Sequence, residues 1–597
     1  MKNPISVFRQ RISDFQQQEK YYHIRYQWIS WLRILIFLGG VGLSIYLFFQ
    51  GKDAAGFIVL GAAYLLFILV MRGHNRIGYS RNHFRFLRQI NEQEIRRSEG
   101  HLTDFEGGDA YRDALHPYTS DLDIFGSHSL FQLLNRSTTT IGKDKLAQWL
   151  QEAASVPEIG RRQEAVAELT PDIDWRQHFQ AWAWHYRQEV TQPLRFFEWL
   201  KGPDFFRGKV LLKIATFVLP VLTIAAWVWW FNGGSIYLPL GLMAIQASLA
   251  YTYSAARDEY YEQSSGMYEV LRSYTSLLKH IESRPFQAPM AVDLQKRLQV
   301  EGRPASGRLQ QLASIVEYLS ARLNATISIF LNTILMWDFF WMVRLEYWKK
   351  RMAVNLEPVL EVVGQFEALS SLASYQYAHP AYAVPEISEQ PFEVKATALG
   401  HPLIFAAERI TNDFSLAGAG KTVVITGSNM SGKSTFLRTL GLNMVLALAG
   451  GAACAARFRV YPVQVFTGMR TEDNLAEHTS SFYAELKRLK QVLDLTQTGT
   501  PVFYLLDEIL KGTNSRDRHL GAMALIRQLH KRNASGLIST HDLELGKIQE
   551  EIPEHIQNFS FNSTIEGDEI LFDYKLHEGV CHSFNASKLM QKMGIEI

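Results

Sequence analysis

The stretch Lys421-Thr-Val-Val-Ile-Thr-Gly427-Ser-Asn-Met-Ser-Gly432-Lys433-Ser-Thr435 decides the fold of the C-terminal part of this sequence. A run of β-branched residues is followed by the pattern G-x-x-x-x-G-K-S and then by a helical stretch, 436–448. In this strand–loop–helix setting the pattern predicts a phosphate-binding loop. The glycines let backbone N–H groups face phosphate oxygens, and the helix N-terminus adds positive potential.

The loop residues have separate expected roles. The Lys433 ammonium can reach the β- and γ-phosphates, and the Ser434 hydroxyl can ligate Mg²⁺. ATP and Mg²⁺ are therefore the predicted cofactors. We expect the nucleotide to contact the whole loop, which consists of Gly427, Ser428, Asn429, Met430, Ser431, Gly432, Lys433, Ser434 and Thr435.

Two further apolar runs end in polar residues. Val502-Phe-Tyr-Leu-Leu is typical of a strand buried on both faces, and Asp507 and Glu508 follow it. We expect Asp507 to hold Mg²⁺ through water and Glu508 to polarise the attacking water as a general base. A run from Gly536 ends at His541, a candidate sensor of the γ-phosphate. Alone, the first run could be a strand before a helix cap, and the histidine an ordinary surface residue.

The N-terminal part contains long runs without charged side chains. The first two span 34–51 and 54–71, and a Gly-rich break divides a longer run into 214–231 and 236–256. Eighteen helical residues cover roughly 27 Å, near the lower limit for a bilayer. We expect two transmembrane hairpins; the alternative is buried helices of a large soluble protein.

Basic residues flank these hairpins on one side. Because such residues favour the cytoplasmic side, we expect a multi-pass protein of the cytoplasmic membrane, with both termini in the cytoplasm. A fifth apolar block, 327–343, holds Asp338 at its middle, which favours a core helix over a further span. The flanking residues are Arg9, Arg11, Lys20, Arg25, Arg33, Arg72, Arg76, Arg81, Arg85, Arg88, Lys201, Arg207, Lys209 and Lys213.

Composition excludes several protein classes. Two cysteines in 597 residues cannot form a disulfide framework or a zinc ribbon. With 61 Lys and Arg against 59 Asp and Glu, the net charge of +2 gives no overall electrostatic case for nucleic acid binding. The chain divides into a helix and hairpin (1–90), a polar linker (91–120), a helical region carrying the second hairpin (121–390) and an α/β region (391–597).

The motifs of the α/β region resemble those of the MutS family of DNA mismatch repair ATPases, a branch of the ABC-type ATPases. Three blocks carry the resemblance: the loop 427–435, Asp507-Glu-Ile-Leu-Lys-Gly-Thr513, and Ser539-Thr-His541. The helical region 121–390 is similar to the family's core, or lever, domain. The resemblance implies an all-α lever domain, here with transmembrane hairpins, followed by an α/β P-loop NTPase domain of ABC type.

The resemblance also implies a partner and further site residues. The segment from Asp473 to Glu485 resembles the family signature, whose serine, here Ser480, reaches the γ-phosphate bound by the other chain of a dimer. Read alone, Ser480 could merely cap the following helix. Ile410 matches the residue that lies against adenine, and Asn429 one that contacts the γ-phosphate region. A homodimer with composite ATP sites is thus expected.

Double-stranded DNA is a candidate partner, although nothing before residue 120 resembles the family's mismatch-reading domain. Two other interpretations stay open. The first is a nucleotide-switched membrane scaffold with no DNA role. The second is an ABC-type transport ATPase, which four spans and a missing Leu-Ser-Gly-Gly signature disfavour.

Overall fold

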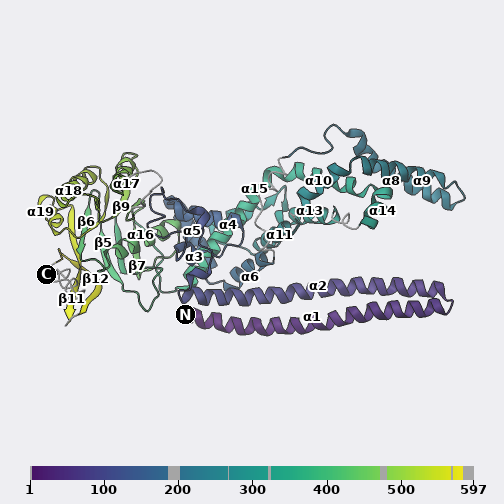
Figure 1. The fold of residues 1–597 in the computed structure, drawn as a ribbon, viewed down its shortest axis with the longest axis horizontal. Helices are drawn as coiled ribbons and strands as arrows, with labels where there is room; N and C mark the ends of the chain where they lie inside the picture. Colours follow the sequence, from purple (N-terminus) through teal and green to yellow (C-terminus); the bar gives the residue numbers. More distant parts are fainter. Residues whose placement is uncertain are drawn as a thin grey trace.

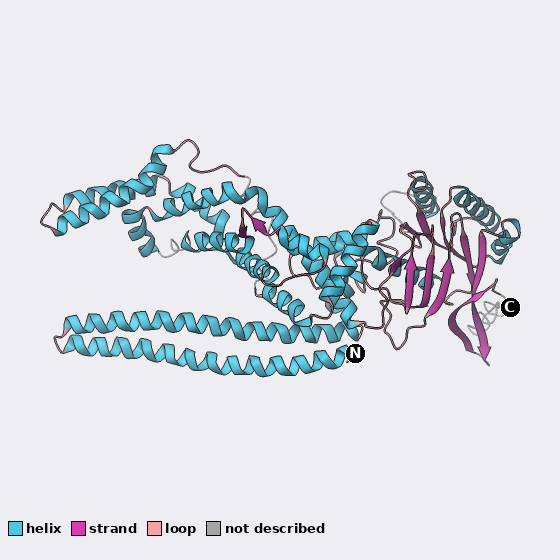
Figure 2. Cartoon of the chain, turned by 180° about the vertical axis from the view of Figure 1, so that it is seen from behind, coloured by secondary structure: helices cyan, strands magenta, loops and turns pink. Residues whose placement is uncertain are grey.

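The computed structural model describes residues 3–185, 202–265, 268–319, 325–470, 481–566 and 569–581. The molecule is elongated, with an α/β region at one end, a helical region in the middle and helical hairpins extending to the other end (Figure 1). Figure 2 shows the same division by secondary structure, with the large sheets confined to the C-terminal end.

A six-stranded sheet forms the centre of the α/β region, in the order β12-β11-β6-β10-β9-β8. The five strands from β11 to β8 are parallel, and β12 is antiparallel. The predicted strands are present as β6, β9 and β10. The bounds are β6 Thr422–Gly427, β8 Gln464–Gly468, β9 Val502–Asp507, β10 Ser535–Thr540, β11 Ile556–Glu566 and β12 Glu569–Glu578.

Helices cover both faces of this sheet. Alternate strand residues enter two separate cores: Val423 packs in the core that contains α16, and Val424 in the one that contains α17 and α18. A smaller sheet, in the order β3-β7-β4-β5, lies beside the larger one. The remaining bounds here are β3 Glu386–Ile387, β4 Val394–Leu399, β5 Asn412–Leu416, α16 Lys433–Ala449, β7 Arg457–Val460, α17 Ser481–Leu495, α18 Ser515–Lys531 and α19 Ile548–Glu551.

The helical region is organised around α15, which spans 42 residues and is about 63 Å long. Its buried side chains share one core with α4, α5, α11, α13 and α16, so the helical and α/β regions pack together. The helices are α3 Leu130–Leu134, α4 Thr140–Gln151, α5 Val156–Leu169, α6 Ile173–Trp184, α10 Ser254–Ser265, α11 Tyr268–Glu282, α12 Pro289–Lys296, α13 Ala305–Leu319 and α15 Trp337–Ala378, with a β1 Gln299–Val300 and β2 Arg303–Pro304 hairpin.

Two helical hairpins extend from this region. The first pairs α1 (Pro4–Phe49) with α2 (Asp53–Ser98), and the second pairs α8 (Val210–Phe231) with α9 (Tyr237–Thr252). Both turns lie at the end of the molecule farthest from the sheets (Figure 1). Within the described residues, α1, α2 and α8 are long and apolar enough to cross a membrane, whereas α9 is shorter than the predicted 236–256.

The structure departs from the predicted boundaries in two places. Residues 91–98, which the sequence assigns to a linker, continue α2 and pack against α6, where Asn91 Nδ2 donates to Gln177 Oε1 at 2.9 Å. The block 327–343 is not one core helix: α14 (Ala325–Leu335) packs beside α8 and α9, with Phe330 62% exposed. The backbone of Met336 is left-handed, and α15 begins at the next residue. In the first turn of α15, Asp338 forms a buried ion pair with Arg257 at 2.8 Å.

Candidate nucleotide site

The phosphate-binding loop connects β6 to α16. Gly432 has a left-handed φ of 106°, and a Cβ there would lie 3.2 Å from the Tyr574 ring, so glycine suits this position. Lys433 is only 4% exposed, and its Nζ donates to the carbonyls of Gly427 at 2.8 Å and Ser428 at 2.9 Å. Burial lowers the pKa of this ammonium. The loop therefore surrounds a cation at the start of a helix.

The strand order brings the predicted acidic residues to the same place. Because β9 and β10 are parallel, their carboxyl ends lie at the same edge as that of β6. The Glu508 N–H donates to the Ser539 carbonyl at 3.0 Å, and the Ser539 hydroxyl donates to the Asp507 carboxylate. Glu508 Oε1 lies 3.9 Å from Lys433 Nζ and 3.8 Å from His541 Nδ1.

The charges around Glu508 keep it ionised. Burial alone would raise the pKa of Glu508, but Lys511, with its Nζ 3.3 Å away, and then Lys433 and His541 lower it below its ordinary value. His541 Nε2 faces an Arg518 N–H at 3.1 Å. Since a guanidinium can only donate, Nε2 is the acceptor in this contact, and Nδ1 is the ring nitrogen that faces Glu508.

The loop residues fit a bound triphosphate. The Ser428 and Ser431 hydroxyl oxygens are buried with no hydrogen-bond partner among the described residues, so both hydroxyls can hydrogen-bond to a phosphate in the loop. Asn429 and Met430 are exposed, as is Thr435, and Ser434 is half-buried in the first turn of α16. Within the described residues, no cluster of three His, Cys, Asp or Glu could hold a metal alone. This donor set suits Mg²⁺, which is usually bound by one or two carboxylates plus substrate phosphates.

The remaining predicted residues lie farther out or were not described. Ser480 falls within 471–480, outside the described residues. Ile410 is 44% exposed just before β5. Asn412, on that strand, donates through Nδ2 to the Tyr574 carbonyl at 3.1 Å and accepts the Leu576 N–H at 2.9 Å. These bonds join the Ile410 segment to β12, the strand that carries the Tyr574 ring to the loop.

One carboxylate of the site was not assigned a role from the sequence. Glu485, on α17, accepts the backbone N–H groups of Leu510 and Lys511, the latter at 3.1 Å. It thereby fixes the turn that follows Glu508. Burial raises the pKa of Glu485. The sequence feature that could have revealed Glu485 is its place as the last residue of the signature segment. Lys511 was missed too, and the feature that could have revealed it is its place three residues after Glu508.

Comparisons with known proteins agree with this geometry. Residues 423–593 match MutS domain V. Residues 423–593 therefore form a domain of the MutS type.

The relatives of this chain include three curated proteins. The DNA mismatch repair protein MutS of Thermotoga maritima is 34% identical over 236 residues, covering 39% of this chain and 29% of that protein. MutS of Natronomonas pharaonis is 29% identical, covering 40% and 28%, and MutS 2 of Halobacterium salinarum is 29% identical, covering 41% and 28%. The chain thus spans less than a third of the length of these relatives.

Asp121 connects MutS domain V to the helical region. Its buried carboxylate accepts the Thr467 hydroxyl at 2.7 Å, the Met469 N–H at 3.1 Å and the Arg470 N–H at 3.0 Å. Asp123 pairs with Arg470 at 2.9 Å. Arg470 immediately precedes the segment 471–480, in which the sequence resembles the MutS signature and which lies outside the described residues. The residues that lead into that segment are therefore bonded directly to the helical region.

Proposed function

We propose that this chain is a membrane-anchored ATPase of the MutS type. Two chains form a dimer with composite sites, and ATP hydrolysis moves the helical levers and the hairpins attached to them. The observation that carries the proposal is the convergence of Lys433 and His541 on Glu508, each within 4 Å of its carboxylate, at the carboxyl edge of the sheet. A lysine cation, an ionised carboxylate and a histidine are groups that suit phosphoryl transfer to water.

Each residue has a role in this proposal. Lys433 binds the β- and γ-phosphates, and the backbone of the loop orients them. Glu508 accepts a proton from the attacking water, and His541 donates its Nδ1–H toward the γ-phosphate. Mg²⁺, held by Ser434 and through water by Asp507, neutralises phosphate charge when bound. Ser480 of the second chain completes the site.

The surfaces of the hairpins support membrane anchoring. Both carry large apolar side chains that face outward, and an isolated hairpin with such a surface needs lipid or a partner to cover it. Trp28 and Trp31, 73% and 69% exposed, precede the first apolar run, and Trp229 lies near the turn of the second hairpin. Aromatic residues at both ends of an apolar band are typical of spans at the two interfaces of a membrane.

The anchored arrangement includes a long spacer. Residues 4–33 of α1 and 72–98 of α2, called the stalk from here on, precede and follow the apolar runs. Thirty helical residues extend about 45 Å. In the proposed orientation the stalk, the helical region, MutS domain V and both termini lie in the cytoplasm, and the two turns lie on the opposite side of the membrane.

Cysteine labelling tests this orientation. Cys454 and Cys581 are buried, so added cysteines would report position. In intact cells, an impermeant maleimide should label Lys52→Cys, at a turn, whereas Glu99→Cys, at the end of the stalk, should react only after permeabilisation. Recovery of the chain in the soluble fraction without detergent would reject the anchor.

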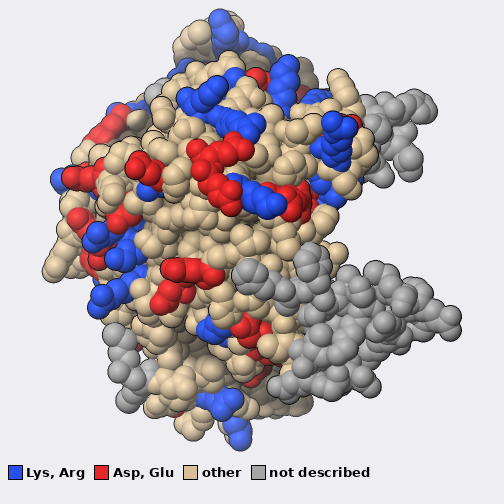
Figure 3. Space-filling view, turned by 90° about the vertical axis from the view of Figure 1, so that its left-hand side faces the viewer, with Lys and Arg blue, Asp and Glu red and all other residues tan. Residues whose placement is uncertain are grey.

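DNA is the proposed partner, because the relatives are named DNA mismatch repair proteins. A specific observation keeps the scaffold without DNA as a second candidate: acidic and basic side chains alternate over the described surface of the α/β end, with no large basic area on the face in view (Figure 3). Hydrolysis measured with duplex DNA at several salt concentrations separates the two. Stimulation that falls as salt rises supports DNA binding, and no stimulation at low salt supports the scaffold.

A further inference from the structure

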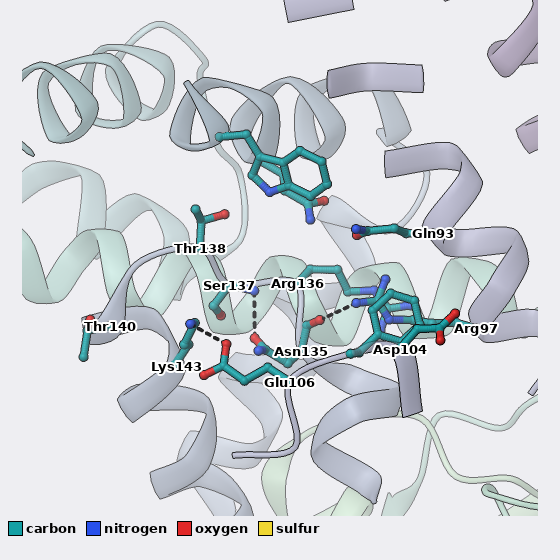
Figure 4. A pocket seen from close by; sticks show the side chains of 13 residues that line it. Gln93, Arg97, Asp104, Glu106, Asn135, Arg136, Ser137, Thr138, Thr140 and Lys143 are labelled. Carbon is teal, nitrogen blue, oxygen red and sulfur yellow. Dashed lines mark hydrogen bonds and ion pairs between the residues drawn. The ribbon is translucent and has the colours of Figure 1, made fainter. Parts of the chain in front are cut away.

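A polar cavity lies where the stalk meets the helical region. Its volume is about 320 Å³, and five segments enclose it: the end of α2, the turn at 104–106, the loop 135–139, the start of α4 and α6. Figure 4 shows Arg136, Asn135 and Ser137 on one wall, with Gln93 and Arg97 from α2 beside them. The cavity is more than 200 residues away in sequence from any part of the nucleotide site.

Cations dominate the wall behind the cavity. Arg136 binds Glu94 through two hydrogen bonds of 2.9 and 2.8 Å, and Arg97 NH1 lies 3.6 Å from the same carboxylate. Burial alone would raise the pKa of Glu94, but Arg136, Arg97 and Arg176 lower it instead. Three guanidinium groups therefore lie close enough to one buried carboxylate to stabilise its charge. Of the two acidic side chains in the lining, Asp104 pairs with Arg96, and Glu106 pairs with Lys143, which also lines the cavity.

Hydroxyl groups line the cavity as well. Ser137 is 8% exposed, and its Oγ has no hydrogen-bond partner among the described residues; the same is true of Thr138 Oγ1. Buried hydroxyls usually have partners, because a donor that is buried without an acceptor destabilises the fold. The amides of Gln93 and Gln180 add donors, and Trp184 supplies a flat apolar wall.

We propose that this cavity binds a small soluble phosphate ester, whose oxyanion meets Arg136, Lys143 and the hydroxyls of Ser137 and Thr138. The volume falls at the small end of ligand pockets, which suits a molecule about the size of a nucleoside monophosphate. A lipid headgroup is too far away, because Arg97 follows the apolar run of α2 by 26 residues, or about 39 Å of helix. The bound ligand would join the stalk to the helical region.

Ligand-dependent thermal unfolding and calorimetry of the full chain in detergent test the proposal. The Lys433→Ala background removes binding at the phosphate loop. In it, inorganic phosphate and adenosine monophosphate should each raise the melting temperature saturably. Ser137→Ala should weaken that binding about tenfold, the value of one charge-assisted hydrogen bond. Nanodiscs containing phosphatidic acid should give no more stabilisation than neutral nanodiscs; a larger effect would assign the site to a lipid and overturn the soluble ligand.

A carboxylate introduced into the cavity by substitution gives a more decisive test. Gln180→Glu places a negative charge at the cavity, so the melting temperature without ligand should rise and the response to phosphate should disappear. The matched change Gln310→Glu, at an exposed position of α13, should leave the response intact. The proposal is overturned if neither probe gives a saturable response, if Gln180→Glu retains it, or if chloride at equal ionic strength reproduces it.

Discussion

Replacement of Glu508 by glutamine tests the chemistry of the nucleotide site most directly. The substitution keeps the size of the side chain and one acceptor oxygen, but removes the charge and the base. A positioned general base contributes about 10²–10⁴-fold to a rate, so kcat should fall by that factor. The carboxylate lies 3.9 Å from Lys433 and 3.3 Å from Lys511, and its loss leaves both ammonium groups for the phosphates. ATP should therefore bind as tightly as before, or more tightly.

The assay is phosphate release at saturating Mg-ATP, paired with equilibrium ATP binding. Glu554→Gln, at an exposed position of the same domain, is the control. Because the pKa of Glu508 is lowered, its ionised form persists as pH falls through the ordinary carboxyl range near 4.3, so this residue should not limit kcat between pH 5 and 8. Turnover within about threefold of the unmodified protein, with binding retained, would refute the assigned role.

Three further predictions concern the same framework. Lys433→Ala should weaken Mg-ATP binding at least about 100-fold in a fluorescent-nucleotide titration, since a buried phosphate contact is lost; unchanged affinity would exclude the loop as the site. Asp121→Ala leaves three donors unmet and should lower the free energy of unfolding by about 3 kcal/mol in denaturant titrations, whereas Asp109→Ala, on the surface, should not. Burial raises the pKa of Glu367 to about 7, so the folded state holds a proton that the unfolded chain releases near pH 4.3. Stability should fall as pH rises from about 4.3 through 7, by at most about 1.4 kcal/mol per unit. Glu367→Gln should abolish that slope and exposed Glu357→Gln, on the same helix, should keep it; a slope that survives Glu367→Gln would contradict the assignment.

Local patterns were sufficient to predict the strands that build the site. The runs at 423–426, 502–506 and 536–540 are β-branched or apolar apart from Gly536 and Ser539, and each strand is buried on both faces. Parallel strands then place Lys433, Asp507 and His541 at one edge without further information. The contacts of Glu485 could not be predicted in this way, because it bonds to Leu510, 25 residues away, through backbone groups that carry no sequence signal.

The helical region was harder to predict because its elements depend on contacts made over long distances in sequence. The end of α2 is rich in charged residues and resembles a linker, yet Glu94 and Arg97 are buried there against the loop at 132–136. The break at Met336 contains neither glycine nor proline. A left-handed residue at that point is held by its surroundings, among them the pairing of Asp338 with Arg257.

The length of α15 has a mechanical consequence. A rod of about 63 Å that tilts by 5° at one end displaces the other end by about 5 Å, so a sub-ångström change near bound nucleotide can become a shift as large as one helical turn. Pro358 lies within this rod and removes a backbone hydrogen bond, which makes bending easiest there. The position of Pro358 therefore determines how much of such a displacement of α15 reaches the hairpin at its far end and how much is lost to bending at the proline.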